Sequence, residues 1–162
     1  MTTITHLQCL LVQAPLFWAD PDANRRQLET IVRQQGAGCD LVVFPETFTS
    51  GFLGDAEAEP ETMQGETVAW MTALASELGT VLCGSAAIST SRGNANRFLW
   101  VQPDGEVAYY DKRHLFSFGG EDQRYVAGRE RKVFSYRGWR ICPQICYDLR
   151  FPVWCRNRDD YD

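Results

Sequence analysis

Short apolar runs alternate with helix-like segments through the first ninety residues of the chain. Leu7–Val12, Leu41–Phe44 and Val81–Ile88 are mainly apolar runs of strand length, and we expect the first to be a buried strand. Leu41–Phe44 is apolar throughout, so it is expected inside a sheet that is covered on both faces. Strands that alternate with helices are typical of parallel βαβ units. The pattern therefore predicts an α/β fold.

The two segments between these strands carry signals for helix ends. Asp20-Pro21 combines an N-cap carboxylate with a proline in the first turn, and Gly36 is expected to end the helix that follows. A second helix is predicted over Thr67–Leu78, because apolar residues recur there at helical spacing and Gly79 follows as a C-cap.

The rest of the chain predicts antiparallel hairpins rather than further βαβ units. The expected elements are a polar loop at Ser89–Asn94, a strand at Asn96–Val101, a turn at Pro103-Asp104-Gly105, a strand at Val107–Tyr110, a turn at Arg137-Gly138 and a strand at Trp139–Ile145. The order βαβαβ followed by hairpins predicts a mixed sheet with two helices on one face.

The size and charge of the chain restrict its class and its partners. A chain of 162 residues with 44% hydrophobic content is long enough for one domain with a sizeable core. The formal net charge of -5 argues against nucleic acid or an anionic membrane as a partner. Met1–His6 lacks the features of a secretory signal, and no apolar run approaches membrane-spanning length, so a cytoplasmic protein is expected.

The cysteine pattern favours reduced thiols over disulfides or a metal centre. The chain has no paired C-x-x-C spacing, and only His6 and His114 could supply imidazole ligands, so we expect no zinc site. Cys9 and Cys83 lie within apolar runs, where packing in the core is the default expectation. The six cysteines are Cys9, Cys39, Cys83, Cys142, Cys146 and Cys155.

Cys146 directly follows the largely apolar segment Val133–Ile145. A thiol at a strand-to-helix turn lies near a helix N-terminus, where the thiolate is favoured and can act as a nucleophile. The alternative is a buried cysteine that acts as a small hydrophobic side chain.

Glu46 and Lys112 also follow strand-like runs directly. Each alone would most simply be an exposed side chain, but a carboxylate, an ammonium and a thiol that all end strands favour one convergent site. In such a site Glu46 can accept the thiol proton, and Lys112 can stabilise a thiolate and then an oxyanion.

Three sequence blocks resemble the signature blocks of the nitrilase, or carbon–nitrogen hydrolase, superfamily. They are Phe44-Pro45-Glu46, Tyr110-Asp111-Lys112-Arg113-His114-Leu115-Phe116 and Ile145-Cys146-Tyr147-Asp148-Leu149-Arg150-Phe151-Pro152. Two further segments, Glu46–Phe52 and Pro152–Asn157, are similar to the bacterial omega-amidase-like branch. The resemblance covers essentially the whole chain.

The resemblance implies a fold and a set of site residues. It implies an αββα sandwich with a catalytic triad of Glu46, Lys112 and Cys146, and it places a second glutamate of the family at Glu121. Family domains continue well beyond 162 residues, so residues 1–162 are expected to be a single carbon–nitrogen hydrolase domain that is incomplete at the C-terminus.

Further residues of these blocks are candidates for supporting roles. The backbone N–H of Tyr147 is expected to help Lys112 hold the oxyanion. Asp148 and Arg150 are expected to hold the turn through hydrogen bonds and an ion pair, or Arg150 instead contacts a substrate carboxylate, and the sequence leaves both open. His114 offers an alternative base, although a role in orienting its loop is preferred.

The implied activity is the hydrolysis of a carbon–nitrogen bond other than a peptide bond. The favoured substrate is a small primary amide, the omega-amide of a 2-oxo dicarboxylic acid, which is converted to acid and ammonia through a cysteine thioester without metal or organic cofactor. A carbamoylase or a nitrilase of the same superfamily is the alternative, and a non-catalytic assembly module is a second. The resemblance also implies a homodimer or a higher homo-oligomer.

Overall fold

A mixed five-stranded sheet organises the computed structural model, which describes residues 5–52 and 59–162. The first three strands are parallel and the last three are joined by antiparallel pairing, in the spatial order β1-β2-β3-β4-β5. The strands are β1 (Cys9–Leu11), β2 (Leu41–Val43), β3 (Val81–Thr90), β4 (Gly93–Val101) and β5 (Val107–Asp111).

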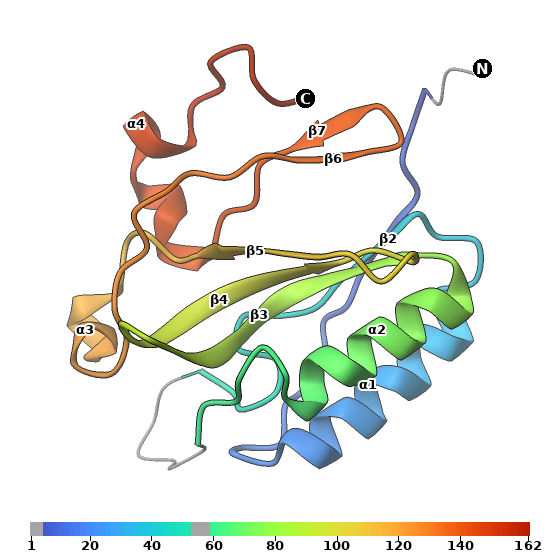
Figure 1. Cartoon of the computed structure of the whole chain (residues 1–162), viewed down its shortest axis with the longest axis horizontal. Coiled ribbons are helices and arrows are strands. Elements are labelled where there is room, and N and C mark those ends of the chain that lie inside the picture. The colour runs from blue at the N-terminus through green and yellow to red at the C-terminus, as the bar shows by residue number, and fades with distance from the viewer. Residues whose placement is uncertain (1–4, 53–58) are drawn as a thin grey trace.

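Two helices cover one face of this sheet, as the sequence predicted. Figure 1 shows α1 (Pro21–Gln35) and α2 (Glu66–Leu78) side by side beneath β3 and β4. The Asp20 side chain caps α1 by accepting a hydrogen bond from the Ala23 amide at 2.9 Å, and Gly79 ends α2 with a φ of 66°. Both predicted helices are therefore confirmed together with their ends.

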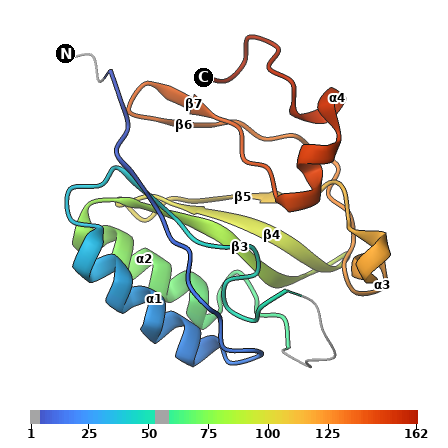
Figure 2. The same ribbon diagram turned by 180° about the vertical axis from the view of Figure 1, so that it is seen from behind.

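A hairpin and two short helical segments lie over the opposite face. β6 (Phe134–Tyr136) and β7 (Trp139–Ile141) pair with each other only, and η2 (Cys146–Arg150) and α4 (Pro152–Cys155) follow them (Figure 2). The short elements η1 (Ser117–Gly119) and α3 (Glu121–Arg124) project from the end of β5.

Each face of the sheet has its own hydrophobic core. The helix-side core is formed by residues such as Leu28, Val42 and Leu99, all fully buried. On the other side Trp100 stacks on Phe134 with their ring centroids 5.3 Å apart, which joins β4 to the β6–β7 hairpin. The sheet is thus covered on both faces, as the apolar sequence of β2 predicted.

The prediction that Leu7–Val12 is a buried strand was wrong. Only Cys9–Leu11 forms a strand, Cys9 is exposed, and the Leu11 side chain is 73% exposed. The reason is that β1 is the outermost strand of the described sheet and has a neighbour on one side only. Cys83 lies on β3 and is buried, as expected.

Two further boundaries differ from the prediction. Ser89–Asn94 is not a loop, because β3 continues to Thr90 and β4 begins at Gly93, where these two residues pair across a tight turn. The strand expected over Trp139–Ile145 ends at Ile141, so Cys146 does not directly follow a paired strand. Among the described residues, no helix is both long and apolar enough to cross a membrane.

Candidate active site

Glu46 lies in a turn that follows β2 and is hydrogen-bonded to β3. The Thr47 amide donates to Ser85 Oγ at 2.9 Å, and the Phe48 amide donates to the Ser85 carbonyl at 3.0 Å. These bonds place the Glu46 side chain at the carboxyl end of the parallel strands, where it is 19% exposed.

Lys112 follows β5 directly and has a fully buried side chain. Its Nζ lies 2.7 Å from Glu46 Oε1 and 2.8 Å from Glu121 Oε2. Backbone hydrogen bonds from its amide to the Asn96 carbonyl and from the Gly128 amide to its own carbonyl hold this segment in place. Buried charges in proteins are usually paired and hydrogen-bonded, and this ammonium between two carboxylates meets both conditions.

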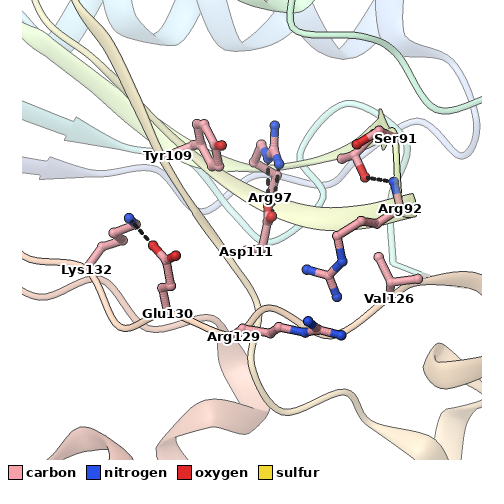
Figure 3. A pocket seen from close by; sticks show the side chains of 10 residues that line it. Ser91, Arg92, Arg97, Tyr109, Asp111, Val126, Arg129, Glu130 and Lys132 are labelled. Carbon is pink, nitrogen blue, oxygen red and sulfur yellow. Dashed lines mark hydrogen bonds and ion pairs between the residues drawn. The ribbon is translucent and has the colours of Figure 1, made fainter.

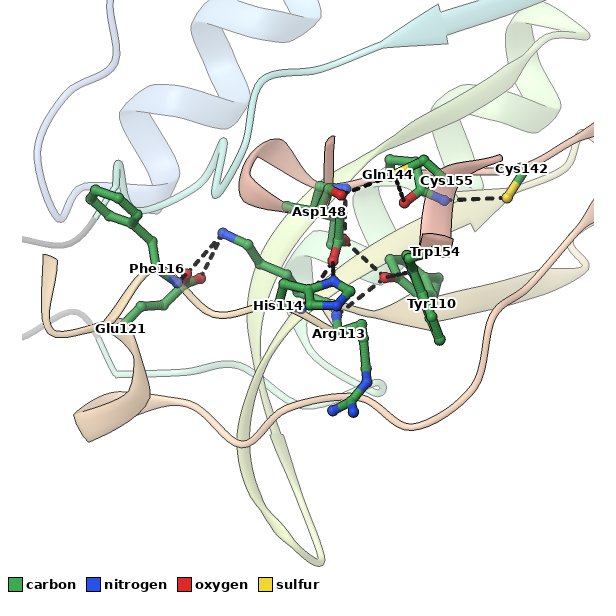
Figure 4. Close-up of polar contacts among 12 residues, drawn as sticks. Tyr110, Arg113, His114, Phe116, Glu121, Cys142, Gln144, Asp148, Trp154 and Cys155 are labelled. Atoms are coloured by element: carbon green, nitrogen blue, oxygen red, sulfur yellow. Dashed lines mark hydrogen bonds and ion pairs between the residues drawn. The ribbon is translucent and has the colours of Figure 1, made fainter. Parts of the chain in front are cut away.

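Glu121 is the first residue of α3 and is also fully buried. Besides Lys112, its Oε2 accepts a hydrogen bond of 2.6 Å from the Phe116 amide, as Figure 4 shows. The structure therefore brings Glu121 together with Glu46 and Lys112.

Cys146 begins η2 and has a φ of 43°, which is rare for a residue with a side chain. Partial burial raises the pKa of its thiol, the charge of Glu46 and a hydrogen bond to that carboxylate raise it further, and Lys112 opposes the shift. The prediction that a helix N-terminus favours the thiolate was wrong, because only a five-residue 3-10 helix begins there and the charge of Glu46 raises the pKa of the thiol.

The protonation of Lys112 is supported by the two glutamates. Burial disfavours its charge, but hydrogen bonds and attraction from Glu121 and Glu46 outweigh that effect and raise the pKa of the ammonium. The result is a protonated lysine beside a protonated thiol at neutral pH, with two carboxylates close by. Such an arrangement suits a mechanism in which a carboxylate removes the thiol proton during attack.

Asn96 is a member of this cluster that the sequence reasoning missed. It lies on β4, is fully buried, and its Nδ2 donates to Glu46 Oε1 and to Glu121 Oε1, both at 2.9 Å. An asparagine within a strand carries no chemical signature. Its position could have been inferred from the predicted hairpin, because Asn96 begins one predicted strand and the strand that pairs with it ends just before Lys112.

Asp148 connects the lysine segment to the cysteine segment. Its buried carboxylate accepts hydrogen bonds from the His114 amide at 2.9 Å and from the Tyr110 hydroxyl at 2.8 Å (Figure 4). It also accepts a hydrogen bond from the Ile145 amide at 3.1 Å. These bonds tie the turn before Cys146 to the end of β5.

His114 is engaged with this carboxylate. Its Nδ1 lies 2.8 Å from Asp148 Oδ1, and its ring stacks on Phe151 with centroids 3.7 Å apart. These contacts favour the orienting role over the alternative in which His114 is the base.

Tyr147 and Arg150, the two remaining predicted site residues, have different surroundings. In the described part of the chain the Tyr147 amide donates no hydrogen bond, so it is available at the position expected of an oxyanion donor. Arg150 is exposed, and no ion pair joins it to a described residue. The ion pair expected between Asp148 and Arg150 is absent from the described contacts.

A separate cavity lies beside the β3–β4 turn. It has a volume of about 260 Å³ and is open and polar (Figure 3). Its charged groups are partly paired, with Arg97 bonded to both oxygens of Asp111 at 2.6 and 2.9 Å and Lys132 bonded to Glu130. None of Glu46, Lys112, Glu121 and Cys146 lines it, and its described lining has no thiol. Within residues 5–52 and 59–162, no cluster of three or more His, Cys, Asp and Glu side chains is arranged to hold a metal ion.

Comparisons with known proteins agree with this geometry. Residues 11–159 match the protein family described as carbon-nitrogen hydrolase. Omega-amidase YafV of Yersinia enterocolitica is 49% identical over 160 residues, which cover 96% of this chain and 60% of that protein. The 2-oxoglutaramate amidase of Bacillus subtilis (strain 168) is 27% identical over 154 residues, which cover 93% of this chain and 59% of that protein.

A solved structure supports the fold at high identity. A CN-hydrolase superfamily protein of Xanthomonas campestris, with an arsenic adduct in its active site, is 52% identical and superimposes with a TM-score of 0.90. The match covers 94% of this chain and 57% of that chain. The predicted nitrilase-like fold class is confirmed, and the chain spans about three fifths of the length of the relatives it matches.

Proposed function

The chain belongs to the carbon–nitrogen hydrolase family, and from this membership we propose that it hydrolyses a small primary amide to a carboxylic acid and ammonia. We take residues 1–162 as part of a single domain that performs this reaction. The observation that carries the proposal is the convergence of Lys112 with Glu46 and Glu121, at 2.7 and 2.8 Å, beside the thiol of Cys146.

The first half of the reaction forms a thioester. Cys146 Sγ attacks the amide carbon while Glu46 takes the thiol proton, so no free thiolate has to accumulate beside the carboxylate. The carbonyl oxygen becomes an oxyanion, which Lys112 and the Tyr147 amide stabilise. Collapse of this intermediate breaks the carbon–nitrogen bond, and Glu46 returns the proton to the departing ammonia.

The second half releases the acid. Glu46 accepts a proton from a water molecule, the resulting hydroxide attacks the thioester carbon, and the carbon–sulfur bond breaks. The proton returns to Cys146, so that the net reaction consumes one water per amide. Glu121 serves as the second partner of Lys112 and keeps its ammonium in place through both halves.

The substrate that we propose is the omega-amide of a 2-oxo dicarboxylic acid. Support comes from the names of two relatives, an omega-amidase at 49% identity and a 2-oxoglutaramate amidase at 27% identity. Such a substrate has a free carboxylate, and the exposed guanidinium of Arg150 is a candidate to bind it.

We also propose self-association and a cytoplasmic location. Leu149 and Val153, next to the nucleophile, are 67% and 69% exposed, which suits contact with a second copy. Phe151 stacks on His114, and Trp154 Nε1 donates a hydrogen bond to the Tyr110 hydroxyl, so these two aromatic side chains take part in internal packing. Sedimentation velocity of the natural-length protein measures the oligomeric state, and a monomer would contradict this part of the proposal.

The activity is tested by ammonia release from a defined panel of substrates. The natural-length protein is incubated with 2-oxoglutaramate, 2-oxosuccinamate, an N-carbamoyl amino acid and a simple nitrile. Cys146→Ser serves as the control for the nucleophile. We expect release from the two omega-amides and a loss of at least about 10³-fold in the variant, because its hydroxyl is a much weaker nucleophile.

The pattern across the panel separates the alternatives. Turnover of nitriles or carbamoyl compounds without omega-amides would move the protein to another activity of the family. An intact mass that shows no acyl adduct on Cys146 with any compound, together with no ammonia release, would favour the non-catalytic assembly module.

A further inference from the structure

We propose that Asn96 is a positioning residue that holds Glu46 and Glu121 together and leaves one oxygen of Glu46 free to exchange protons with Cys146. The inference rests on the proposed amide hydrolysis and adds to it a residue outside the expected catalytic set. It assigns the two oxygens of Glu46 to different tasks.

Asn96 and Lys112 together close a ring of hydrogen bonds with the two glutamates. Asn96 Nδ2 lies 2.9 Å from Glu46 Oε1 and 2.9 Å from Glu121 Oε1. Lys112 Nζ lies 2.7 Å and 3.0 Å from the same two oxygens. Each donor therefore bridges both carboxylates, and the separation of the two glutamates depends on the amide as well as on the ammonium.

The orientation of the Asn96 amide follows from its surroundings. Turned by 180°, its oxygen would face two carboxylate oxygens, which only accept hydrogen bonds. In the observed orientation its Oδ1 is buried and finds no hydrogen-bond partner within the described chain. An unsatisfied buried acceptor costs stability, so this asparagine is better explained by the bonds of its Nδ2 than by a contribution to folding.

The ring leaves Glu46 with one occupied and one available oxygen. Oε1 accepts from both Asn96 and Lys112, which uses its two lone pairs. No described amide, amine or hydroxyl donates to Oε2. Oε2 is therefore the oxygen of Glu46 that is available to take the proton of the Cys146 thiol, whose pKa the neighbouring Glu46 raises.

Four titratable groups face Glu46, and they come from three segments of the chain. Lys112 follows β5, Glu121 begins α3, Tyr125 follows α3 and Cys146 begins η2. Burial and the charge of Glu121 raise the pKa of Tyr125 to about 12, so its hydroxyl remains neutral in the working range. The two carboxylates thus face one ammonium, and Asn96 supplies the remaining donor without adding charge.

The test replaces Asn96 by Asp in the natural-length protein and measures kcat/KM for 2-oxoglutaramate as a function of pH. The substitution keeps the shape, removes the donor and adds a third acid, so the cluster retains a proton at higher pH. We expect the acid limb of the profile to move up by about one pH unit or more, which corresponds to about tenfold or more at a fixed pH on that limb.

A second variant and a matched control isolate this effect. Asn96→Ala removes the donor without new charge and is expected to move the limb in the same direction by a smaller amount. Asn94→Asp makes the same chemical change two residues earlier on β4, where the side chain makes no hydrogen bond to a described residue. Its profile should match that of the unmodified protein, and thermal unfolding of all variants verifies that they fold.

A readout that needs no turnover separates this inference from the proposed function. The rate at which iodoacetamide alkylates the peptide that contains Cys146 is measured by mass spectrometry across pH. For Asn96→Asp this curve should move to higher pH, because added negative charge disfavours the thiolate. If the unmodified protein hydrolyses no amide, the proposed function fails while this curve still tests Asn96.

Two results would overturn the inference. One is an acid limb that stays in place in both Asn96 variants while kcat/KM falls equally at every pH, since a purely structural residue would behave in that way. The other is an alkylation curve that is unchanged in Asn96→Asp.

Discussion

Cys146 has a backbone conformation that L-residues rarely adopt, and its neighbours hold it there. Its φ is 43°, and Asp148, two residues later, accepts hydrogen bonds from Ile145, His114 and Tyr110. A local conformation of this kind persists only where the surrounding bonds over-determine it. Asp148 therefore supports the conformation of Cys146 through the hydrogen bonds of this turn.

Replacing Asp148 by Asn should lower both activity and stability. Asparagine keeps only one acceptor oxygen, so its NH2 group would face either the His114 amide or the Ile145 amide and leave that donor unpaired. We expect a loss of about 2–4 kcal/mol in the free energy of unfolding and a fall in kcat of at least about tenfold. Urea denaturation and steady-state kinetics measure the two quantities.

A matched change on the surface serves as the control. Asp122→Asn alters an exposed carboxylate in α3 and should change stability by less than about 0.5 kcal/mol. If Asp148→Asn is as stable and as active as the unmodified protein, the turn is held by something other than this carboxylate.

At the residue scale the sequence indicated candidate reactive groups but not the residues that support them. Glu46, Lys112 and Cys146 were predicted as site residues because each follows a strand-like run and lies within a block that resembles a family. Asn96 was missed because an asparagine within a strand does not by itself indicate a functional site. Only the pairing of β4 with β5 places it next to Lys112. Two partners of Asp148, His114 and Tyr110, lie 34 and 38 residues away in the sequence, at a distance that no local pattern encodes.

Among the elements, the close packing of the segment after β2 against β3 sets the position of Glu46. A side chain at Gly84 would place its Cβ 2.7 Å from Phe44 Cβ and 3.0 Å from Phe48 Cδ1. Neither atom is the far end of a flexible chain, so the turn that carries Glu46 would have to shift. The glycine thus permits the turn to lie on the sheet.

Gly84→Ala should therefore reduce activity by more than its effect on stability explains. We expect a loss of about 1–3 kcal/mol from overpacking and a fall in kcat of roughly tenfold or more as Glu46 moves away from Lys112. The measurements are chemical denaturation and kinetics at a temperature where the variant remains folded.

Gly105→Ala is the control for stability alone. Gly105 lies in the β4–β5 turn with a φ of 89°, and the nearest atom to an added Cβ is Thr72 Cγ2 at 4.0 Å. Backbone strain should cost about 1–2 kcal/mol without moving the site. Equal kcat values for the two glycine variants would refute the role of Gly84 in positioning Glu46.

The order of the elements was predictable from local signals, whereas their exposure and exact ends were not. Asp20, Pro21 and Gly79 mark helix ends through their own conformations, so these boundaries could be predicted. The exposure of β1 and the extension of β3 to Thr90 depend on which strands pair beside them. Strand pairing is part of the tertiary structure, and an apolar sequence pattern does not specify which strands pair.

Across the whole molecule, burial raises the pKa of several acids that are neutral in the folded state. Cys83 is fully buried within the sheet, and desolvation raises the pKa of its thiol far above the ordinary value. Burial and the charge of Asp148 do the same for Tyr110. The raised pKa of the Lys112 ammonium acts in the same direction, because its stabilising charge is retained until the pH passes the folded-state pKa.

These shifts predict that the protein loses stability in alkali. An acid whose pKa is raised by folding keeps its proton after the unfolded chain has released it, so stability is full below the unfolded pKa and falls above it. For a thiol this fall begins near pH 8.5, and each such group contributes about 1.4 kcal/mol per pH unit. The free energy of unfolding, measured by urea denaturation under reducing conditions, should decrease steadily from about pH 8.5 to pH 10.

Cys83→Ala separates the contribution of this thiol from the rest. The substitution leaves a small cavity and lowers stability at every pH, but it removes one titrating group, so the slope above about pH 8.5 should become shallower by up to about 1.4 kcal/mol per unit. Ala86→Gly, on the same strand, also costs stability and should leave the slope unchanged. If both variants retain the original slope, the alkaline loss arises from the other groups whose pKa is raised, which are Tyr110, Lys112 and the thiols of Cys9, Cys142, Cys146 and Cys155.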